Sequence, residues 1–322
     1  MKNKLIAIGE LLIDFIPNEK GRKLKDVQSF IRVAGGAPAN VCVCVSQLGQ
    51  KSLMITKVGN DAFGEFLTET LRQSNVDVSA IRKTDLANTA LAFVSIDKHG
   101  ERDFSFYRNP SADLLLDENE IDESLFQPQD VLHFCSVDLI DAPVKKAHYK
   151  AISYAHKHQL IVSFDPNLRF PLWPDKIKYR NTILEFIPMA HILKISDDEL
   201  FFITGIEDIE QAIQSLFQGF VKIIILTKGS QGASVYSRTN QFFVPSIKVN
   251  VVDTTGAGDA FIGAIIYQVL NHQITIDQLE TKIDENIIRF AHQVSAIVVS
   301  RYGAIPAMPK LTDIEINVKY KT

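Results

Sequence analysis

The chain has 322 residues, of which 46% are hydrophobic and 22% are charged, a composition typical of a globular protein with a sizeable core. Its formal net charge is −4, so composition gives no basic surface for nucleic acid or for an anionic membrane. Glu10 and Asp14 interrupt the first apolar run too early for a signal peptide, and no later run reaches membrane-spanning length. We expect a cytoplasmic protein without nucleic-acid or membrane partners, whose three cysteines are reduced.

In chain order, short β-rich runs give way to alternating buried strands and helices. Strands are predicted at 5–8, 11–16, 53–58, 90–96 and 104–107, with helices at 37–48 and 63–71. Lys98, His99 and Gly100 are typical of a hairpin turn. Strands are then predicted at 131–135, 161–164, 192–195, 223–226, 242–244 and 249–252, and a helix at 260–270.

This alternation predicts parallel βαβ units, and therefore an α/β fold with a central, mostly parallel sheet flanked by helices. The early hairpins predict a small β-sheet lid, inserted at approximately 11–34 and 88–110 of a single domain spanning 1–322. In such open parallel sheets, ligands bind beyond the carboxyl ends of the strands.

The most informative stretch is 253–261, which reads Asp-Thr-Thr-Gly-Ala-Gly-Asp-Ala-Phe. Gly256, Ala257 and Gly258 open a predicted helix, where unpaired backbone N–H groups and the helix dipole can hold an anion. Asp259 follows in the first helical turn. A carboxylate beside a phosphate makes sense if it accepts a proton from an attacking hydroxyl. For an isolated Gly-Ala-Gly-Asp, an Asp that merely complements the dipole is an equal alternative.

Two other stretches place polar groups where a small polar ligand could bind. Gly35 and Gly36 precede a helix whose first turns carry Asn40; a tight turn explains the glycines, and room for a flat polar ligand is the functional alternative. Asp14 lies in an otherwise apolar strand, where it is either exposed on the free face of the lid or bound to sugar hydroxyls.

These stretches resemble the ribokinase (pfkB) family of sugar kinases. Segment 253–261 matches the C-terminal signature of that family, and 34–40 resembles its N-terminal sugar-binding signature. The resemblance runs from Gly9 to Pro309 and is closest to fructokinases, through segments 104–113, 164–173 and 303–309. It implies a ribokinase-like fold and an ATP-binding, magnesium-dependent carbohydrate kinase that converts D-fructose to fructose 6-phosphate.

The resemblance also implies roles for individual residues. Asp259 would be the catalytic base, with Gly256, Ala257 and Gly258 as the anion hole. The implied sugar contacts are Asp14, Gly35, Gly36, Asn40, Phe106, Arg108, Arg169 and Asp259. The implied ATP contacts are Lys194, Thr227, Gly229, Gly232, Gly256, Gly258 and His292, the last replacing an Asn that is usual in relatives.

Ions and partners follow in the same way. Glu199 is implied to order water around Mg2+, although a capping box with Ser196 explains both residues by itself. Asp253 and Thr255 are implied to belong to a monovalent-cation site, for K+, and the lids of two subunits are implied to pair in a homodimer. Close alternatives on the same fold are 2-keto-3-deoxygluconate kinase, ribokinase and aminoimidazole riboside kinase. A non-catalytic sugar sensor is an alternative of another class, which the retained Asp259 and anion loop disfavour.

Overall fold

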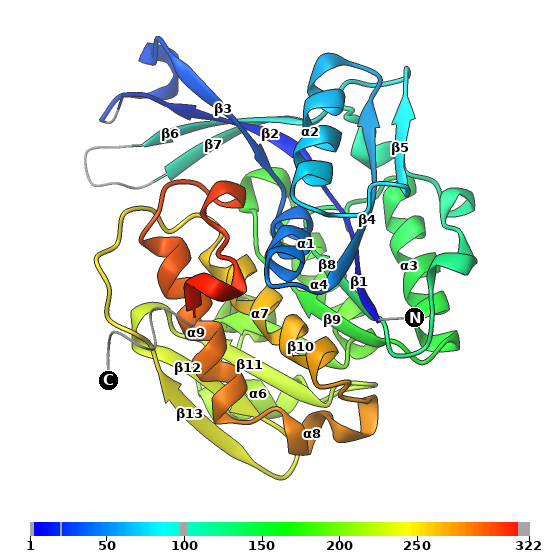
Figure 1. Ribbon diagram of the computed structural model, residues 1–322, viewed down its shortest axis with the longest axis vertical. Coiled ribbons are helices and arrows are strands. Elements are labelled where there is room, and N and C mark those ends of the chain that lie inside the picture. The colour runs from blue at the N-terminus through cyan, green and yellow to red at the C-terminus, as the bar shows by residue number, and fades with distance from the viewer. Residues whose placement is uncertain (1–2, 20, 97–101, 315–322) are drawn as a thin grey trace.

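The computed structural model describes residues 3–19, 21–96 and 102–314, and a nine-stranded sheet runs through its centre (Figure 1). The strand order is β13-β12-β11-β10-β9-β8-β1-β4-β5. Neighbouring strands are parallel except at β11–β12 and β12–β13, which are antiparallel. The strands are β1 Lys4–Ile8, β4 Lys51–Gly59, β5 Ile81–Thr84, β8 Val131–Cys135, β9 Ile161–Asp165, β10 Ile192–Ser196, β11 Ile223–Thr227, β12 Gly232–Tyr236 and β13 Gln241–Pro245. The predicted α/β class is confirmed.

Helices cover both faces of this sheet, so its strands are apolar on both sides. Along β1, Leu5 and Ala7 enter one core, whereas Ile6 and Ile8 enter the other, as the period of two in a strand requires. The first core is closed by α1 Ala37–Gln47, α2 Ala62–Gln73, α7 Ala257–Asn271, α8 Leu279–Lys282 and α9 Glu285–Val299. The second is closed by α3 Pro143–Lys157, α4 Lys176–Phe186, α5 Asp197–Thr204 and α6 Ile209–Ser215.

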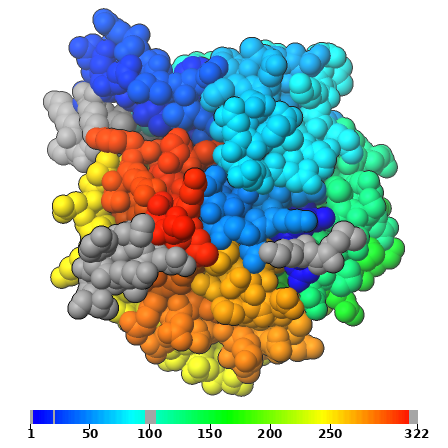
Figure 2. Space-filling model, in the orientation of Figure 1, coloured from blue at the N-terminus to red at the C-terminus, as the bar shows by residue number. Residues whose placement is uncertain are grey.

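A second, four-stranded sheet stands apart from the first and is called the lid below (Figures 1 and 2). Its order is β3-β2-β6-β7. The strands are β2 Leu12–Pro17, β3 Phe30–Gly35, β6 Leu91–Ile96 and β7 Arg102–Tyr107. Apart from Gly35, these strands lie within the segments 11–34 and 88–110 that the sequence assigns to the lid. The turn predicted at 98–100 lies outside the described residues.

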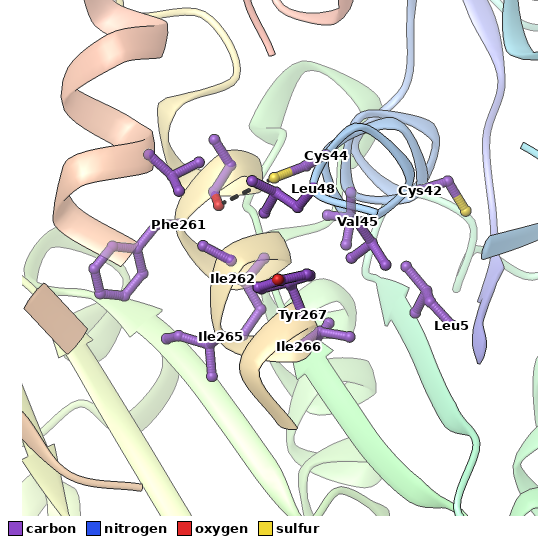
Figure 3. Packing of buried hydrophobic residues seen from close by; sticks show 14 of the residues in the cluster. Leu5, Cys42, Cys44, Val45, Leu48, Phe261, Ile262, Ile265, Ile266 and Tyr267 are labelled. Atoms are coloured by element: carbon purple, nitrogen blue, oxygen red, sulfur yellow. Dashed lines mark hydrogen bonds between the residues drawn. The ribbon is translucent and has the colours of Figure 1, made fainter. Parts of the chain in front are cut away.

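Helices α1 and α7 pack closely, and this contact positions the site described below (Figure 3). A Cβ atom added to Gly263 of α7 would lie 2.9 Å from both Cβ and Sγ of Cys44 in α1, so only glycine fits there. The Sγ of Cys44 lies 3.5 Å from the backbone carbonyl oxygen of Ala260. Cys42, Cys44 and Cys135 are all free and buried, as predicted.

The strand predicted at 249–252 is wrong. The segment is irregular, and Val251 is 62% exposed. The N–H groups of Val252 and Asp253 instead donate to the carbonyl oxygen of Val299, the last residue of α9, at 2.8 and 3.2 Å. The segment therefore bonds to the end of a helix rather than to a strand. Its β-branched residues indicate a preference for extended backbone, but they do not indicate which group its N–H donors will bind. Among the described residues, no helix is long and apolar enough to cross a membrane.

Candidate active site

A cavity of about 480 Å³ lies between the lid and the carboxyl ends of the large sheet's strands. The lid contributes side chains from the face of β2, β6 and β7 that is turned toward the large sheet. The large sheet contributes the loop after β9, one residue of β10 and the beginnings of α1 and α7. The lining residues used below are Glu10, Leu12, Asp14, Asn40, Val94, Phe106, Asn167, Arg169, Leu172, Lys194, Gly256, Ala257, Gly258 and Asp259. The site thus lies where ligands bind in open parallel sheets.

Asp259 is at the centre of this cavity and is held from two sides. It lies in the first turn of α7 and is 7% exposed. The Nδ2 of Asn40, in α1, donates to Oδ2 of Asp259 at 2.8 Å. The Nδ2 of Asn167, in the loop after β9, donates to Oδ1 at 3.0 Å. Each carboxylate oxygen therefore has one amide donor, which fixes the plane of the carboxylate.

Burial raises the pKa of Asp259 above its ordinary value. The amide of Asn40 opposes this rise, as do the positive charges of Arg169 and Lys194 and the amide of Asn167. Because the net direction is upward, Asp259 is a stronger base than an exposed aspartate.

The beginning of α7 next to Asp259 can receive an anion. Gly256 is the N-cap, with a left-handed φ of 76°, and a Cβ there would lie 2.8 Å from Cβ of Ala304. Backbone N–H groups in the first turn of a helix have no partner within the helix and can point toward a ligand, although that of Ala257 donates to the carbonyl oxygen of Thr254 at 3.3 Å. A Cβ on Gly258 would lie 3.1 Å from Nζ of Lys194. A cationic side chain therefore reaches the same place as the helix N-terminus.

Lys194 is itself held by a buried partner. Its Nζ lies 2.8 Å from Oδ2 of Asp165, and both side chains are buried. Burial lowers the pKa of Lys194, but Asp165, Glu199 and Asp259 outweigh burial and raise it overall, so the ammonium stays charged. Burial raises the pKa of Asp165 to about 7, an effect that Lys194 limits. The Oδ1 of Asp165 has no hydrogen-bond partner.

The lid side of the cavity is built for hydroxyl groups. Asp14 lies on the inner face of β2, and Gly35 lies close against it, since a Cβ on Gly35 would lie 2.1 Å from Oδ2 of Asp14. The segment between β1 and β2 that contains Glu10 and Leu11 is called the lid hinge below. Gly36, with φ 114°, allows α1 to begin against it, since a Cβ there would lie 2.4 Å from the carbonyl oxygen of Glu10. Two buried oxygen atoms on this side, Oδ1 of Asn40 and Oε2 of Glu10, have no hydrogen-bond partner.

Arg108, expected to contact the sugar, does not line the cavity. It is 8% exposed, and its guanidinium pairs with Asp113 and Asp138. Glu10 belongs to the same buried cluster, and its Oε1 accepts a hydrogen bond from the backbone N–H of Ala37 at 2.9 Å. The cluster therefore connects the lid hinge, the end of β7 and the loop after β8. Arg169, in contrast, lies in the cavity wall as expected.

Three of the expected ATP contacts lie near the next strand ends but outside the cavity wall. Thr227 pairs in register with Ser196 at the ends of β11 and β10. Gly229, with φ 50°, has open space where a Cβ would be, so its backbone is accessible. At Gly232 a Cβ would lie 2.3 Å from the carbonyl oxygen of Val244, so the turn into β12 explains this glycine without a ligand.

Contacts within the fold account for the position of His292 without a ligand. It is 6% exposed, its Nε2 lies 3.2 Å from the carbonyl oxygen of Val244, and its ring packs against Phe261. Burial lowers its pKa, so the ring is neutral near pH 7. This neutral ring bridges α9 and β13, and it does not line the cavity.

The residues expected near metal ions are engaged with the backbone. Glu199 is 8% exposed, and its Oε1 and Oε2 accept from the N–H groups of Leu168 and Ser196, each at 2.8 Å. Asp253 accepts from the N–H and hydroxyl of Thr255 through Oδ1, and from the N–H of Gly303 through Oδ2. The part of the chain that the structure describes has no group of three or more acidic, His or Cys side chains arranged to hold a metal ion.

Sequence reasoning missed Asn167, Asp165 and Glu10. Asn167 and Asp165 stand in the segment singled out for Arg169, but nothing in the sequence places Asn167 beside a residue 92 positions away. An Asn after Pro is a signal for a left-handed turn, and Asn167 has φ 46°. The pairing of Asp165 with Lys194 could have been suspected, because the two lie at the ends of strands that alternation makes neighbours.

Comparison with known proteins places the chain in a family. Residues 2–311 match the pfkB family carbohydrate kinase profile. The chain is 41% identical over 313 residues to fructokinase-1 from Zea mays, covering 97% of this chain and 96% of that protein. A fructokinase from Xylella fastidiosa with bound ATP superimposes with a TM-score of 0.91 at 33% identity, covering 100% of this chain and 99% of that one.

A second solved structure carries a sugar and an ion. It is a double mutant of a fructokinase from Vibrio cholerae O395 in a fructose-, ADP- and potassium-ion-bound form, with a TM-score of 0.87, 31% identity and 98% of each chain covered. The predicted family and fold are therefore confirmed. The chain belongs to the pfkB family of carbohydrate kinases, and it is an ATP-dependent sugar kinase.

Proposed function

We propose that the protein transfers the γ-phosphoryl group of ATP to the 6-hydroxyl of D-fructose, with Asp259 as the base. The observation that carries the proposal is the position of Asp259. It lies beside the N-terminus of α7 and is held between Asn40 and Asn167 in a cavity that the lid closes on one side. One carboxylate thus stands next to both an anion site and a hydroxyl-binding surface.

In this reaction Asp259 accepts the proton of the attacking hydroxyl. Its raised pKa favours proton transfer, and the loose transition state makes the hydroxyl acidic late in transfer. The backbone N–H groups of Gly256, Ala257 and Gly258 stabilise charge on the transferring group. Nζ of Lys194 adds a fixed positive charge at the same point, because Asp165 holds it there.

Sugar binding divides between polar and apolar surfaces. Asp14 and Oδ1 of Asn40 offer acceptors for hydroxyl groups. Burial raises the pKa of Glu10 to about 8, so near pH 7 its carboxyl group is mostly protonated and Oε2 can donate. Oδ1 of Asn40 and Oε2 of Glu10 have no other partner. A buried acceptor without a partner is costly, so a polyhydroxylated ligand fits this surface better than an apolar one. Leu12, Val94, Phe106 and Leu172 provide the apolar walls that exclude water.

ATP and a divalent cation complete the site. The phosphates would extend from the α7 N-terminus toward Thr227 and Gly229, whose backbone is accessible. Mg2+ prefers phosphate oxygens and water as ligands. When bound, it supplies charge neutralisation of the phosphates. Glu199 would act through water, since its oxygens already accept backbone N–H groups.

A monovalent cation is proposed near the anion site. Asp253 and Thr255 place a carboxylate and a hydroxyl just before Gly256, and a related fructokinase is known in a potassium-bound form. The expected result is higher turnover in potassium chloride than in tetramethylammonium chloride at equal ionic strength. Equal turnover in the two salts would remove the proposal.

The lid supports a proposal of homodimer formation. On the face opposite the cavity, Phe15, Phe30, Phe93 and Tyr107 form an aromatic cluster, in which the rings of Phe15 and Phe93 stack at 4.6 Å. Phe15, Phe30 and Phe93 are partly buried, and Phe15 also packs against Phe63 of α2, whereas Tyr107 is 61% exposed. Exposed aromatic side chains are enriched at interfaces. We expect a dimer mass by light scattering, and a monomer mass for Tyr107→Lys. Ile177→Lys is the control, because Ile177 is 74% exposed on α4, which is not part of the lid.

The substrate is tested by measuring ADP release from MgATP across a panel of sugars: fructose, ribose, glucose, mannose, 2-keto-3-deoxygluconate and aminoimidazole riboside. Turnover strongly selective for fructose is expected. Selective turnover of another member would keep the mechanism and overturn the substrate. Stabilisation by a sugar with no ADP release from any of them would instead support a sugar sensor.

A further inference from the structure

The loop that follows β9 delivers a side chain to Asp259 in an unusual backbone conformation. Asn167 has φ 46°, in the left-handed region that side chains other than Gly, Asn and Asp rarely adopt. Its Nδ2 lies 3.0 Å from Oδ1 of Asp259. Asn40 approaches the other oxygen, Oδ2, from α1. The carboxylate is therefore held between two structural elements that are far apart in the sequence.

Each residue flanking Asn167 is fixed by a separate partner. The backbone N–H of Ser136 donates to the carbonyl oxygen of Pro166 at 3.2 Å, and the Ser136 hydroxyl donates to the same oxygen. The backbone N–H of Leu168 donates to Oε1 of Glu199 at 2.8 Å. A backbone restrained on both sides can keep a residue in a sparsely populated conformation, and such conformations cluster at functional sites.

We propose that Asn167 is a positioning residue for Asp259, and that Glu199 acts through it by fixing the loop. Asn167 and Asn40 each occupy one oxygen of the carboxylate, so its plane is set before the sugar arrives. The remaining lone pairs then face the cavity, where the hydroxyl must be. This inference rests on the proposed role of Asp259 as the base, and it assigns a function to a residue that lines the cavity beside it.

The test compares Asn167→Gly and Asn167→Asp with the wild-type enzyme in the same fructose and MgATP assay. Glycine keeps the left-handed backbone and removes only the amide. Aspartate keeps the shape but places a second carboxylate beside Oδ1 of Asp259. Asn75→Gly is the matched control, because Asn75 also has a left-handed φ, of 62°, but is exposed on the surface after α2.

For Asn167→Gly we expect kcat to fall about 10- to 100-fold, the size of effect that misplacing a reacting group produces. The KM values for fructose and ATP should change less than about threefold, since ground-state contacts remain. The acidic limb of the kcat profile should move to higher pH, because the lost amide stabilised the ionised base. Asn167→Asp should move that limb further and regain activity as the pH rises, and Asn75→Gly should match wild type.

The other titratable groups around Asp259 are unchanged in Asn167→Gly, so a shifted limb in that variant reports the lost amide, whereas Asn167→Asp adds one titratable carboxyl group. They come from every element packed against it: Arg169 from the β9 loop, Asp165 from β9, Lys194 from β10, Cys44 from α1 and Cys135 from β8.

Two results would overturn the assignment. Wild-type kcat and an unmoved pH profile in Asn167→Gly would show that the amide does not position the base. A rise in KM alone would make Asn167 a substrate contact instead. Failure of the base itself would be seen separately, as wild-type turnover in Asp259→Asn.

Discussion

The contact between α1 and α7 controls the geometry of the base, so a substitution at that contact should lower activity without touching the cavity. Asn40 and Cys44 are one turn apart on α1, and Asp259 and Gly263 are one turn apart on α7. The hydrogen bond from Asn40 to Asp259 and the close approach of Cys44 to Gly263 therefore belong to one helix contact. We predict that Gly263→Ala separates the helices.

The size of the effect follows from the distances. A Cβ at position 263 would lie 2.9 Å from Cβ of Cys44. Carbon atoms prefer separations of about 3.5 to 4.0 Å, so the helices must move apart by on the order of 1 Å. That displacement takes the 2.8 Å hydrogen bond between Asn40 and Asp259 beyond about 3.5 Å, where it no longer counts as one. We expect about 1 to 3 kcal/mol of lost stability from overpacking and a kcat about 10- to 100-fold lower.

The assay measures kcat by ADP release and stability by urea unfolding. The double variant Cys44→Gly with Gly263→Ala is the matched control, because it removes the opposing Cβ. It should recover kcat more fully than stability, since glycine in a helix costs about 1 kcal/mol. Wild-type kcat in Gly263→Ala would refute the reasoning, because the helix contact would then not determine the position of the base.

Three further predictions concern the charged groups. Glu10 is buried, and burial, together with Asp138, raises its pKa from 4.5 to about 8. The folded state then binds more protons than the unfolded state, so stability should fall as the pH rises from about 4.5 to about 8. Glu10→Gln should flatten that decline in urea unfolding, and an unchanged slope would contradict the assignment. Lys194→Met should lower kcat about 10²- to 10³-fold and destabilise the fold by leaving Asp165 unpaired. Adding Asp165→Asn should restore stability but not turnover, and restored turnover would remove Lys194 from the phosphate site. Asp14→Asn should raise the KM for fructose about 10- to 100-fold, the value of hydrogen bonds to a charged group. Its KM for ATP should stay near wild type, and equal changes in both would contradict a role in sugar binding.

The sequence predicts most strands of the large sheet because they are short apolar runs between helical segments, but β5 Ile81–Thr84 and β12 Gly232–Tyr236 are not predicted. Val131–Cys135 is predicted to the residue, and Ile192–Ser196 to within one. The strand predicted at 249–252 is wrong for a physical reason. Its valines match a strand pattern, but the N–H groups of Val252 and Asp253 donate to the end of α9. Patterns report local preference, whereas the partner of a backbone group depends on the tertiary fold.

The site is predicted unevenly for a similar reason. The sequence identifies Asp259, Asn40 and Asp14 because each belongs to a recognisable local sequence motif. All three line the cavity. Arg108 also belongs to a local sequence motif, but in the structure it lies in a buried cluster with three carboxyl groups and does not contact the cavity. The sequence does not identify Asn167 as a site residue, because its role depends on a contact with Asp259, which is distant in the sequence. Local motifs indicate which residues matter, and only packing shows what each one contacts.

The most direct test of the account is single-turnover phosphoryl transfer from MgATP to fructose by Asp259→Asn. The account predicts a transfer rate lower by on the order of 10² to 10⁴ with the fold intact. Some stability is lost, because asparagine offers only one acceptor oxygen to the amides of Asn40 and Asn167. Asparagine preserves the shape of the side chain but cannot accept the proton. Transfer at the wild-type rate would contradict the central claim, because the base would then be another group.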